Sequence, residues 1–100
     1  MKRLRYSRKA VGDLDEIWDY TKRSWGREQA NLYTSNIDAA CRALASGEAR
    51  SMRVELGANT FERVRCASHA IFAVEEAEVM LVVRILHLRQ DIEAHLGDSG

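Results

Sequence analysis

The sequence is most apolar at residues 79–86, which read Val79-Met80-Leu81-Val82-Val83-Arg84-Ile85-Leu86. This run is nearly continuous, without the apolar and polar alternation of a strand that has one face in water. A run of this kind is typical of a central strand that is covered on both faces. We therefore expect a sheet with this segment near its centre and other elements packed on it.

An amphipathic helix is predicted near the start of the chain. The residues of its core face recur at three- and four-residue steps: Leu14, Ile17, Trp18, Thr21 and Trp25. Ser7 stands where this helix needs an N-terminal cap, directly after residues 2–6, whose alternation predicts a short strand. Trp18 and Trp25 lie on the core face, so both are expected to pack in the interior.

A second helix is predicted to follow at once, because Gly26 ends the first pattern and a new one begins. The members of the new pattern are Ala30, Tyr33, Ile37, Ala40, Cys41 and Leu44. It is expected to end before Gly47. Two helices joined so tightly should lie antiparallel as a hairpin, which would cover one face of the central strand.

The rest of the chain predicts shorter elements. Residues 61–66 and 70–74 are rich in β-branched and aromatic residues, and the residues between them suit a tight hairpin turn. Residues 47–60 show no clear periodicity and are expected to form a loop, while residues 88–96 are expected to form a short helix. The order β-α-α-β-β-β with a C-terminal helix predicts an α+β fold, in which the helical hairpin packs on a mainly antiparallel sheet.

Composition limits the class of protein. A chain of 100 residues with 46% hydrophobic content suits one domain over residues 1–100, with a flexible tail at 97–100. Lysine plus arginine equal aspartate plus glutamate at 15 each, so no overall charge attracts nucleic acid or anionic lipid. No apolar run is long enough to span a bilayer, and no signal sequence is evident, so a cytoplasmic location is expected. Cys41 and Cys66 fit no zinc-binding spacing and are expected to be reduced.

Three short motifs follow one another along residues 4–96. The first is Asp13-Leu14-Asp15-Glu16-Ile17-Trp18-Asp19-Tyr20-Thr21, continued by Trp25-Gly26, Gln29-Ala30 and Tyr33. The second is His69-Ala70-Ile71-Phe72, and the third is Val83-Arg84-Ile85-Leu86-His87, followed by Arg89, Asp91, Glu93, His95 and Leu96. In this order and at these spacings they resemble the RelE/ParE superfamily of toxins, and most closely its ParE branch.

The resemblance implies the toxin of a type II toxin–antitoxin system. Such a toxin is neutralised by a small ParD-like antitoxin encoded beside it, in a hetero-oligomeric complex, and family members of known action inhibit DNA gyrase by binding. Contact with DNA is then expected only through the antitoxin complex. No cofactor, metal ion, catalytic residue or membrane contact is implied.

Candidate target-binding residues are cations of the second and last predicted strands together with the strand-end motif. They are Arg63, Arg65, Arg84, His87, Arg89 and Asp91. Arg63 and Arg65 alternate and so share a face, and with Arg84 they would form a cationic surface opposite the helices. The other possibility is that Asp91 or Glu93 pairs with Arg84.

Candidate antitoxin-binding residues are Trp18, Tyr20, Tyr33 and Arg84. A groove beside the first helix suits a partner helix, which would insert apolar side chains between the elements. Tyr20 lies off the core face of the helix, so it is expected to be exposed and to serve as the better aromatic anchor.

The C-terminal histidines raise two alternatives, a metal site and a ribonuclease site. His87, Asp91 and His95 stand four residues apart, as metal ligands on one helix do, but the predicted strand extends to His87 and would separate them. A RelE-type ribonuclease that cleaves messenger RNA on the ribosome is the rival function, because a histidine beside a carboxylate suits acid–base chemistry. Against it, no tyrosine follows Tyr33, whereas many such nucleases use a C-terminal tyrosine.

A third reading is a chain that has lost toxicity and persists as a partner of its antitoxin. Gln90 stands where the ParE family usually has methionine, and Ala73 stands where it often has tyrosine. The segment Gly47-Glu48-Ala49-Arg50 replaces a loop that usually contains proline. These departures are consistent with that reading.

Overall fold

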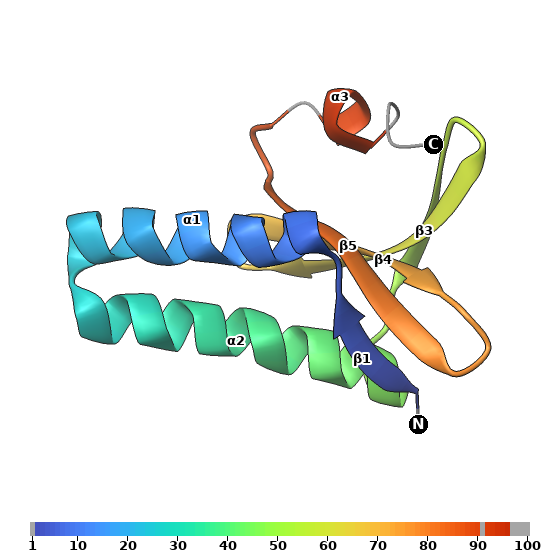
Figure 1. Ribbon diagram of the computed structural model, residues 1–100, viewed down its shortest axis with the longest axis horizontal. Coiled ribbons are helices and arrows are strands. Elements are labelled where there is room, and N and C mark those ends of the chain that lie inside the picture. Colours follow the sequence, from blue (N-terminus) through green and yellow to red (C-terminus); the bar gives the residue numbers. More distant parts are fainter. Residues whose placement is uncertain (1, 91, 97–100) are drawn as a thin grey trace.

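The computed structural model describes residues 2–90 and 92–96 (Figure 1). The elements are β1 (Arg3–Tyr6), α1 (Arg8–Trp25), α2 (Arg27–Ser46), β2 (Met52–Leu56), β3 (Asn59–Cys66), β4 (His69–Glu75), β5 (Val79–His87) and α3 (Ile92–Leu96). The predicted tail at 97–100 lies outside the described residues. Within the described ranges, no helix is long and apolar enough to cross a membrane.

The strands form one mixed sheet in the order β1-β5-β4-β3-β2. β1 pairs with β5 in parallel, and every other neighbouring pair is antiparallel. The apolar strand β5 therefore lies inside the sheet, between β1 and β4, as its composition predicts. The α+β architecture expected from the sequence is confirmed.

The helical hairpin covers one face of this sheet (Figure 1). Ser7 caps α1 as predicted, because its side chain accepts a hydrogen bond from the backbone N–H of Ala10. Gly26 links the helices at a φ of 94°, and Gly47 ends α2 in the left-handed region, both conformations that favour glycine. The core under the hairpin includes Ala10, Ile17, Ile37, Cys41, Ile71, Val82 and Ile85.

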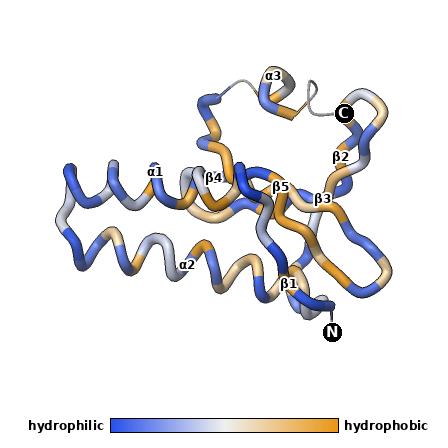
Figure 2. Tube along the Cα trace, viewed as in Figure 1, coloured by the Kyte–Doolittle hydropathy of each residue, from blue (hydrophilic) through white to orange (hydrophobic). Residues whose placement is uncertain are grey.

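The opposite face of the sheet carries a second apolar cluster, into which α3 packs. Its buried members are Phe61, Ala70, Phe72, Leu86 and Leu96. Neighbouring residues of β4 go alternately to the two clusters, and β5 contributes to both clusters as well. Figure 2 shows the apolar residues of these two strands in orange.

The prediction of a loop over residues 47–60 is wrong, because this stretch contains β2 and the start of β3. The strand signal was present, since apolar and charged residues alternate through Met52–Leu56. Glycines at both ends of the stretch gave it the composition of a loop. Gly57, at a φ of 63°, instead forms the tight turn between β2 and β3.

The prediction that both tryptophans pack in the core is wrong for Trp25, which is 74% exposed. The reason is the length of the hairpin, whose closed end projects past the sheet and leaves the last turn of α1 uncovered (Figure 1). Trp18 is partly buried but belongs to neither apolar cluster, so it does not pack in the core either; its Nε1 atom donates to Oδ1 of Asn31 in α2 at 2.9 Å.

Candidate functional site

A groove of about 1040 Å³ runs along α1 and past the ends of β4 and β5 to α3. Exposed aromatic side chains of α1, Tyr20 and Trp25, lie at one end. All three histidines of the chain, His69, His87 and His95, line the groove as well. The groove therefore joins an aromatic surface to a polar one.

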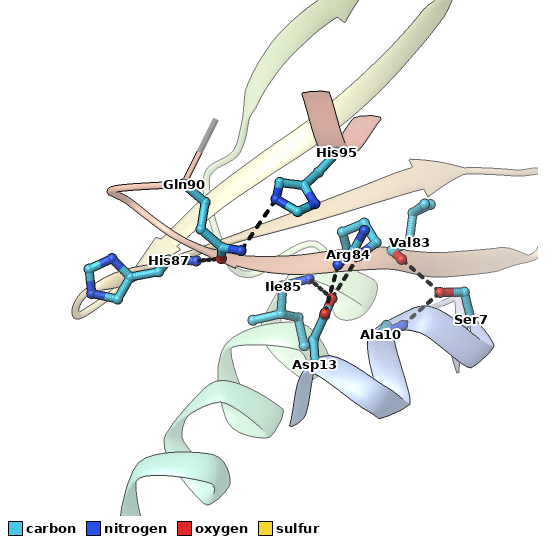
Figure 3. A network of polar contacts seen from close by, with 9 residues as sticks. All are labelled: Ser7, Ala10, Asp13, Val83, Arg84, Ile85, His87, Gln90 and His95. Carbon is cyan, nitrogen blue, oxygen red and sulfur yellow. Dashed lines mark hydrogen bonds and ion pairs between the residues drawn. The ribbon is translucent and has the colours of Figure 1, made fainter. Parts of the chain in front are cut away.

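An ion pair between Asp13 and Arg84 lies in the groove (Figure 3). The Nε and Nη2 atoms of Arg84 each donate to a carboxylate oxygen of Asp13 at 2.9 Å, and the backbone N–H of Ile85 donates to the same carboxylate at 2.9 Å. The two side chains are only 14% and 10% exposed. The pKa of Arg84 is raised by its hydrogen bonds to Asp13, so its guanidinium keeps its charge.

The position of Asp13 follows from the shortness of β1. β1 pairs only with residues 79–82, which leaves the backbone of β5 without a strand neighbour beyond Val82 on that edge. The hydroxyl of Ser7 donates to the carbonyl of Val83 at 2.7 Å, and Asp13 accepts from Ile85. Side chains from the start of α1 thus satisfy the backbone groups that a longer β1 would have paired.

The partner of Arg84 among the described side chains is therefore Asp13. Its guanidinium is held toward α1, so it does not join Arg63 and Arg65 as a free cation of the sheet. Asp91 lies outside the described residues.

The other predicted residues divide between the groove and the surface around it. Tyr20, Tyr33, Arg84 and His87 line the groove. Trp18, Arg63, Arg65 and Arg89 do not, and Arg65 and Arg89 are exposed. His87 lies on β5 and His95 lies on α3. These two histidines therefore do not share a helix, as expected from the predicted extent of the last strand.

The most shifted imidazole belongs to His69, which sequence reasoning listed only as part of a motif. The hydroxyl of Tyr33 lies 2.6 Å from its Nδ1 atom, and the ring of His87 packs against it edge to face. Burial, followed by the neighbouring His87, lowers the pKa of His69 to about 4, although Asp13 acts in the opposite direction. His69 is therefore neutral near pH 7.

Gln90 joins the end of β5 to α3. Its Oε1 atom accepts the backbone N–H of His87 at 2.7 Å, and its Nε2 atom lies 3.4 Å from Nε2 of His95 (Figure 3). The family's usual methionine cannot make these hydrogen bonds. The departure at this position thus has a structural role at the closed end of the groove.

Neither nucleophilic nor metal chemistry is supported by the described residues. Burial raises the pKa of the Cys41 thiol to about 11, so it is protonated and unreactive near neutral pH. In the part of the chain that the structure describes, no group of three or more histidine, cysteine or acidic side chains is arranged to hold a metal ion.

Comparisons with known proteins agree with the fold and the motifs. A family model described as ParE toxin of type II toxin–antitoxin system, parDE, matches residues 4–92. Toxin ParE1 of Caulobacter vibrioides is 34% identical over 97 residues, 97% of this chain and 100% of that protein. Toxin ParE of Escherichia coli is 34% identical over 90 residues, 89% of this chain and 87% of that protein.

The fold also matches a solved structure described as the chromosomal ParDE TA system from P. aeruginosa. The TM-score is 0.76 at 19% identity, covering 89% of this chain and 98% of that one, a likeness that shows the fold alone. The hairpin, the mixed sheet and the terminal helix thus define a small α+β protein with the fold of that solved structure. The match to the family model and the relatives that align over most of their length identify the family. The chain belongs to the ParE toxin family of type II toxin–antitoxin systems, as its motifs predicted.

Proposed function

We propose that a ParD-like antitoxin neutralises this toxin by occupying the groove between α1 and α3. The observation that carries the proposal is that Tyr20, Tyr33 and Arg84, three of the four residues expected to bind an antitoxin, line this one groove. Tyr20 is 64% exposed and Trp25 is 74% exposed. Exposed aromatic anchors beside a groove suit an inserted amphipathic helix, and residues of this type dominate binding energies.

The free toxin acts by binding DNA gyrase rather than by catalysis. The target surface consists of His87, which lines the groove, and of the exposed cations Arg65 and Arg89. Arg89 is near His87 in sequence, and Arg65 is near it in the sheet. By binding one state of gyrase more tightly than the others, the toxin would raise the population of that state, and gyrase would supply the chemistry. This role is supported by the family and by the absence of a reactive nucleophile among the described cysteines.

The deciding experiment is induced expression in bacteria, with and without the adjacent gene. Growth, the DNA-damage response, plasmid supercoiling and bulk translation are followed together. Growth arrest with DNA damage and intact early translation, relieved by the neighbouring gene, is the expected result. Immediate arrest of translation would instead identify a ribonuclease, and normal growth would identify a partner that has lost toxicity.

Substitutions separate the two binding surfaces. The Tyr20→Ala/Trp25→Ala variant should lose about 100-fold or more in antitoxin affinity, on the order of two hot-spot residues, as measured by calorimetry. Leu32→Ala is the matched control, because Leu32 is 55% exposed on α2 and lies outside the groove. Equal affinities for the double variant and the control would remove the groove from the antitoxin interface.

The gyrase surface is tested at exposed arginines. Arg65→Ala/Arg89→Ala should reduce toxicity without unfolding the protein, since neither side chain is paired with a carboxylate in the described part of the chain. Arg84→Ala is unsuitable for this purpose, because it would leave the buried Asp13 carboxylate without its cation. Full toxicity in the double variant, at equal protein levels, would exclude these cations from the target surface.

A further inference from the structure

Two histidines face each other across the β4–β5 pair, within the groove. His69 and His87 are register partners, and their ring centroids lie 5.1 Å apart with the planes at 81°. Partners in an antiparallel register carry their side chains on the same face of the sheet. The two imidazoles therefore form a pair that one chemical group can contact.

Each of these rings uses its Nδ1 atom within the protein. The backbone N–H of Arg89 donates to Nδ1 of His87 at 3.0 Å, so this nitrogen is an acceptor and carries no hydrogen. The hydroxyl of Tyr33 accepts the backbone N–H of Ser68 at 3.3 Å, which leaves its own hydrogen for Nδ1 of His69 at 2.6 Å. With the two Nδ1 atoms used as acceptors, the ring hydrogen of each imidazole is placed on Nε2.

The two Nε2–H groups are hydrogen-bond donors without an acceptor among the contacts of residues 2–90 and 92–96. Two donors on rings whose centroids lie 5.1 Å apart suit a carboxylate, which offers two acceptor oxygens and no hydrogen. A neutral hydroxyl or amide ligand would satisfy such a pair less well, because hydrogen bonds to an ionised acceptor are about twice as strong.

The charges around the pair leave room for an additional carboxylate. The other titratable side chains lining the groove are Asp13, Glu16, Tyr20, Tyr33, Arg84 and His95. The charge of Asp13 is already balanced by Arg84 and by the N–H of Ile85. Glu16 is exposed, where water screens it.

We propose that the His69–His87 pair is a carboxylate-binding point, which takes an aspartate or glutamate side chain of the antitoxin segment in the groove. The inference rests on the proposed function, since it specifies the chemistry of the partner at the same site. An apolar part of that segment covers Tyr20 and Trp25 at the other end of the groove. The bound carboxylate favours the imidazolium form of His69, whose Nδ1–H the Tyr33 hydroxyl can accept, so complex formation takes up a proton near pH 6.

The first test is of the toxin alone, by ¹⁵N NMR of its histidine side chains near neutral pH. Both His69 and His87 should give the spectrum of a ring with a hydrogen on Nε2 and none on Nδ1. A hydrogen on Nδ1 of either ring would overturn the assignment of the donor pair. This measurement needs no antitoxin.

The second test is calorimetry at pH 6, with the antitoxin encoded beside the toxin as the ligand, in buffers of different ionisation enthalpy. The toxin should take up protons on binding, and His69→Gln/His87→Gln should abolish the uptake and weaken binding about 10-fold, on the order of one charged hydrogen bond. Arg50→Gln, an exposed change outside the groove, should retain the uptake. If the double variant does not fold, His69→Gln alone should abolish the uptake.

The outcomes distinguish this inference from the proposed function. A complex that forms without proton uptake, or with the same uptake in the double variant, would overturn the carboxylate site while leaving antitoxin binding in place. Failure of the unmodified toxin to bind the antitoxin would overturn both.

Discussion

Asp13 joins the start of α1 to β5, a strand that is distant from it in sequence. Its carboxylate accepts three hydrogen bonds, two from Arg84 and one from the backbone of β5. Asp13→Asn should therefore lower the free energy of unfolding by about 3–5 kcal/mol, because removing one member of a buried ion pair leaves the other charge unpaired. Urea denaturation measures the loss. Asp15→Asn, an exposed change on the same helix, should alter stability by less than about 0.5 kcal/mol.

His69 makes stability depend on pH. Its pKa is lowered from 6.5 to about 4 in the folded protein, so between these values the unfolded chain binds more protons than the folded one. This group therefore destabilises the protein as pH falls from about 6.5 to about 4. Urea midpoints over this range should fall more steeply for the natural chain than for His69→Gln. Parallel curves would show that His69 titrates normally.

Ala67 occupies the turn between β3 and β4 at a φ of 53°, the left-handed region that disfavours alanine. Ala67→Asn should raise the free energy of unfolding by up to about 1 kcal/mol, since asparagine tolerates this region better. Ala77→Asn, in the turn before β5, is the control, because Ala77 is not among the residues with positive φ. A loss of stability in Ala67→Asn, with the control unchanged, would contradict the strain argument.

The short helix α3 packs on the sheet through its buried residue Leu96. Leu96 is fully buried with Phe72 and Leu86 on the outer face of the sheet. Leu96→Ala should cost about 2–5 kcal/mol, as other large-to-small core changes do. Thermal unfolding measures the loss, with Leu32→Ala as the exposed control. Because His95 lies on α3 and lines the groove, a loosened helix should also weaken antitoxin binding.

Local patterns predicted most elements, and their failures have physical causes. The hairpin, its caps and the buried strand follow from periodicity and from Ser7, Gly26 and Gly47, which act through their own neighbours in sequence. The exposure of Trp25 could not be read in this way, because it depends on how far the hairpin projects past the sheet. β2 was missed because glycines surround its alternating residues.

The site was only partly predictable, because its contacts join distant parts of the chain. The motifs contained Asp13, His69 and Arg84 but did not show that Asp13 caps β5 or pairs with Arg84, more than seventy residues away in sequence. The hydrogen bonds of Gln90 depend in the same way on where β5 ends. The residue types therefore indicated which side chains contribute to the site. Their hydrogen-bonding partners could be identified only once the order of the strands was known.

Refolding of the whole molecule should lack a slow phase from peptide-bond isomerisation, because the sequence contains no proline. Isomerisation of prolyl bonds takes about 10–100 s at 25 °C and produces a slow-folding fraction that grows with time in denaturant. Double-jump refolding, with a variable delay in urea, should show the same kinetics at every delay. A slow fraction that increases with the delay would contradict this expectation.

The groove is built from both ends of the chain. The residues that line it extend in sequence from Asp13 on α1 to His95 on α3. In addition, β1 pairs with β5, so it has no strand partner until β5 has been made. During synthesis, the ribosome must therefore release nearly the whole polypeptide before this surface exists. A product that stops at residue 78 would contain the complete helical hairpin but no β5. Under the proposed function, chains that terminate before β5 should therefore neither arrest growth nor bind the antitoxin.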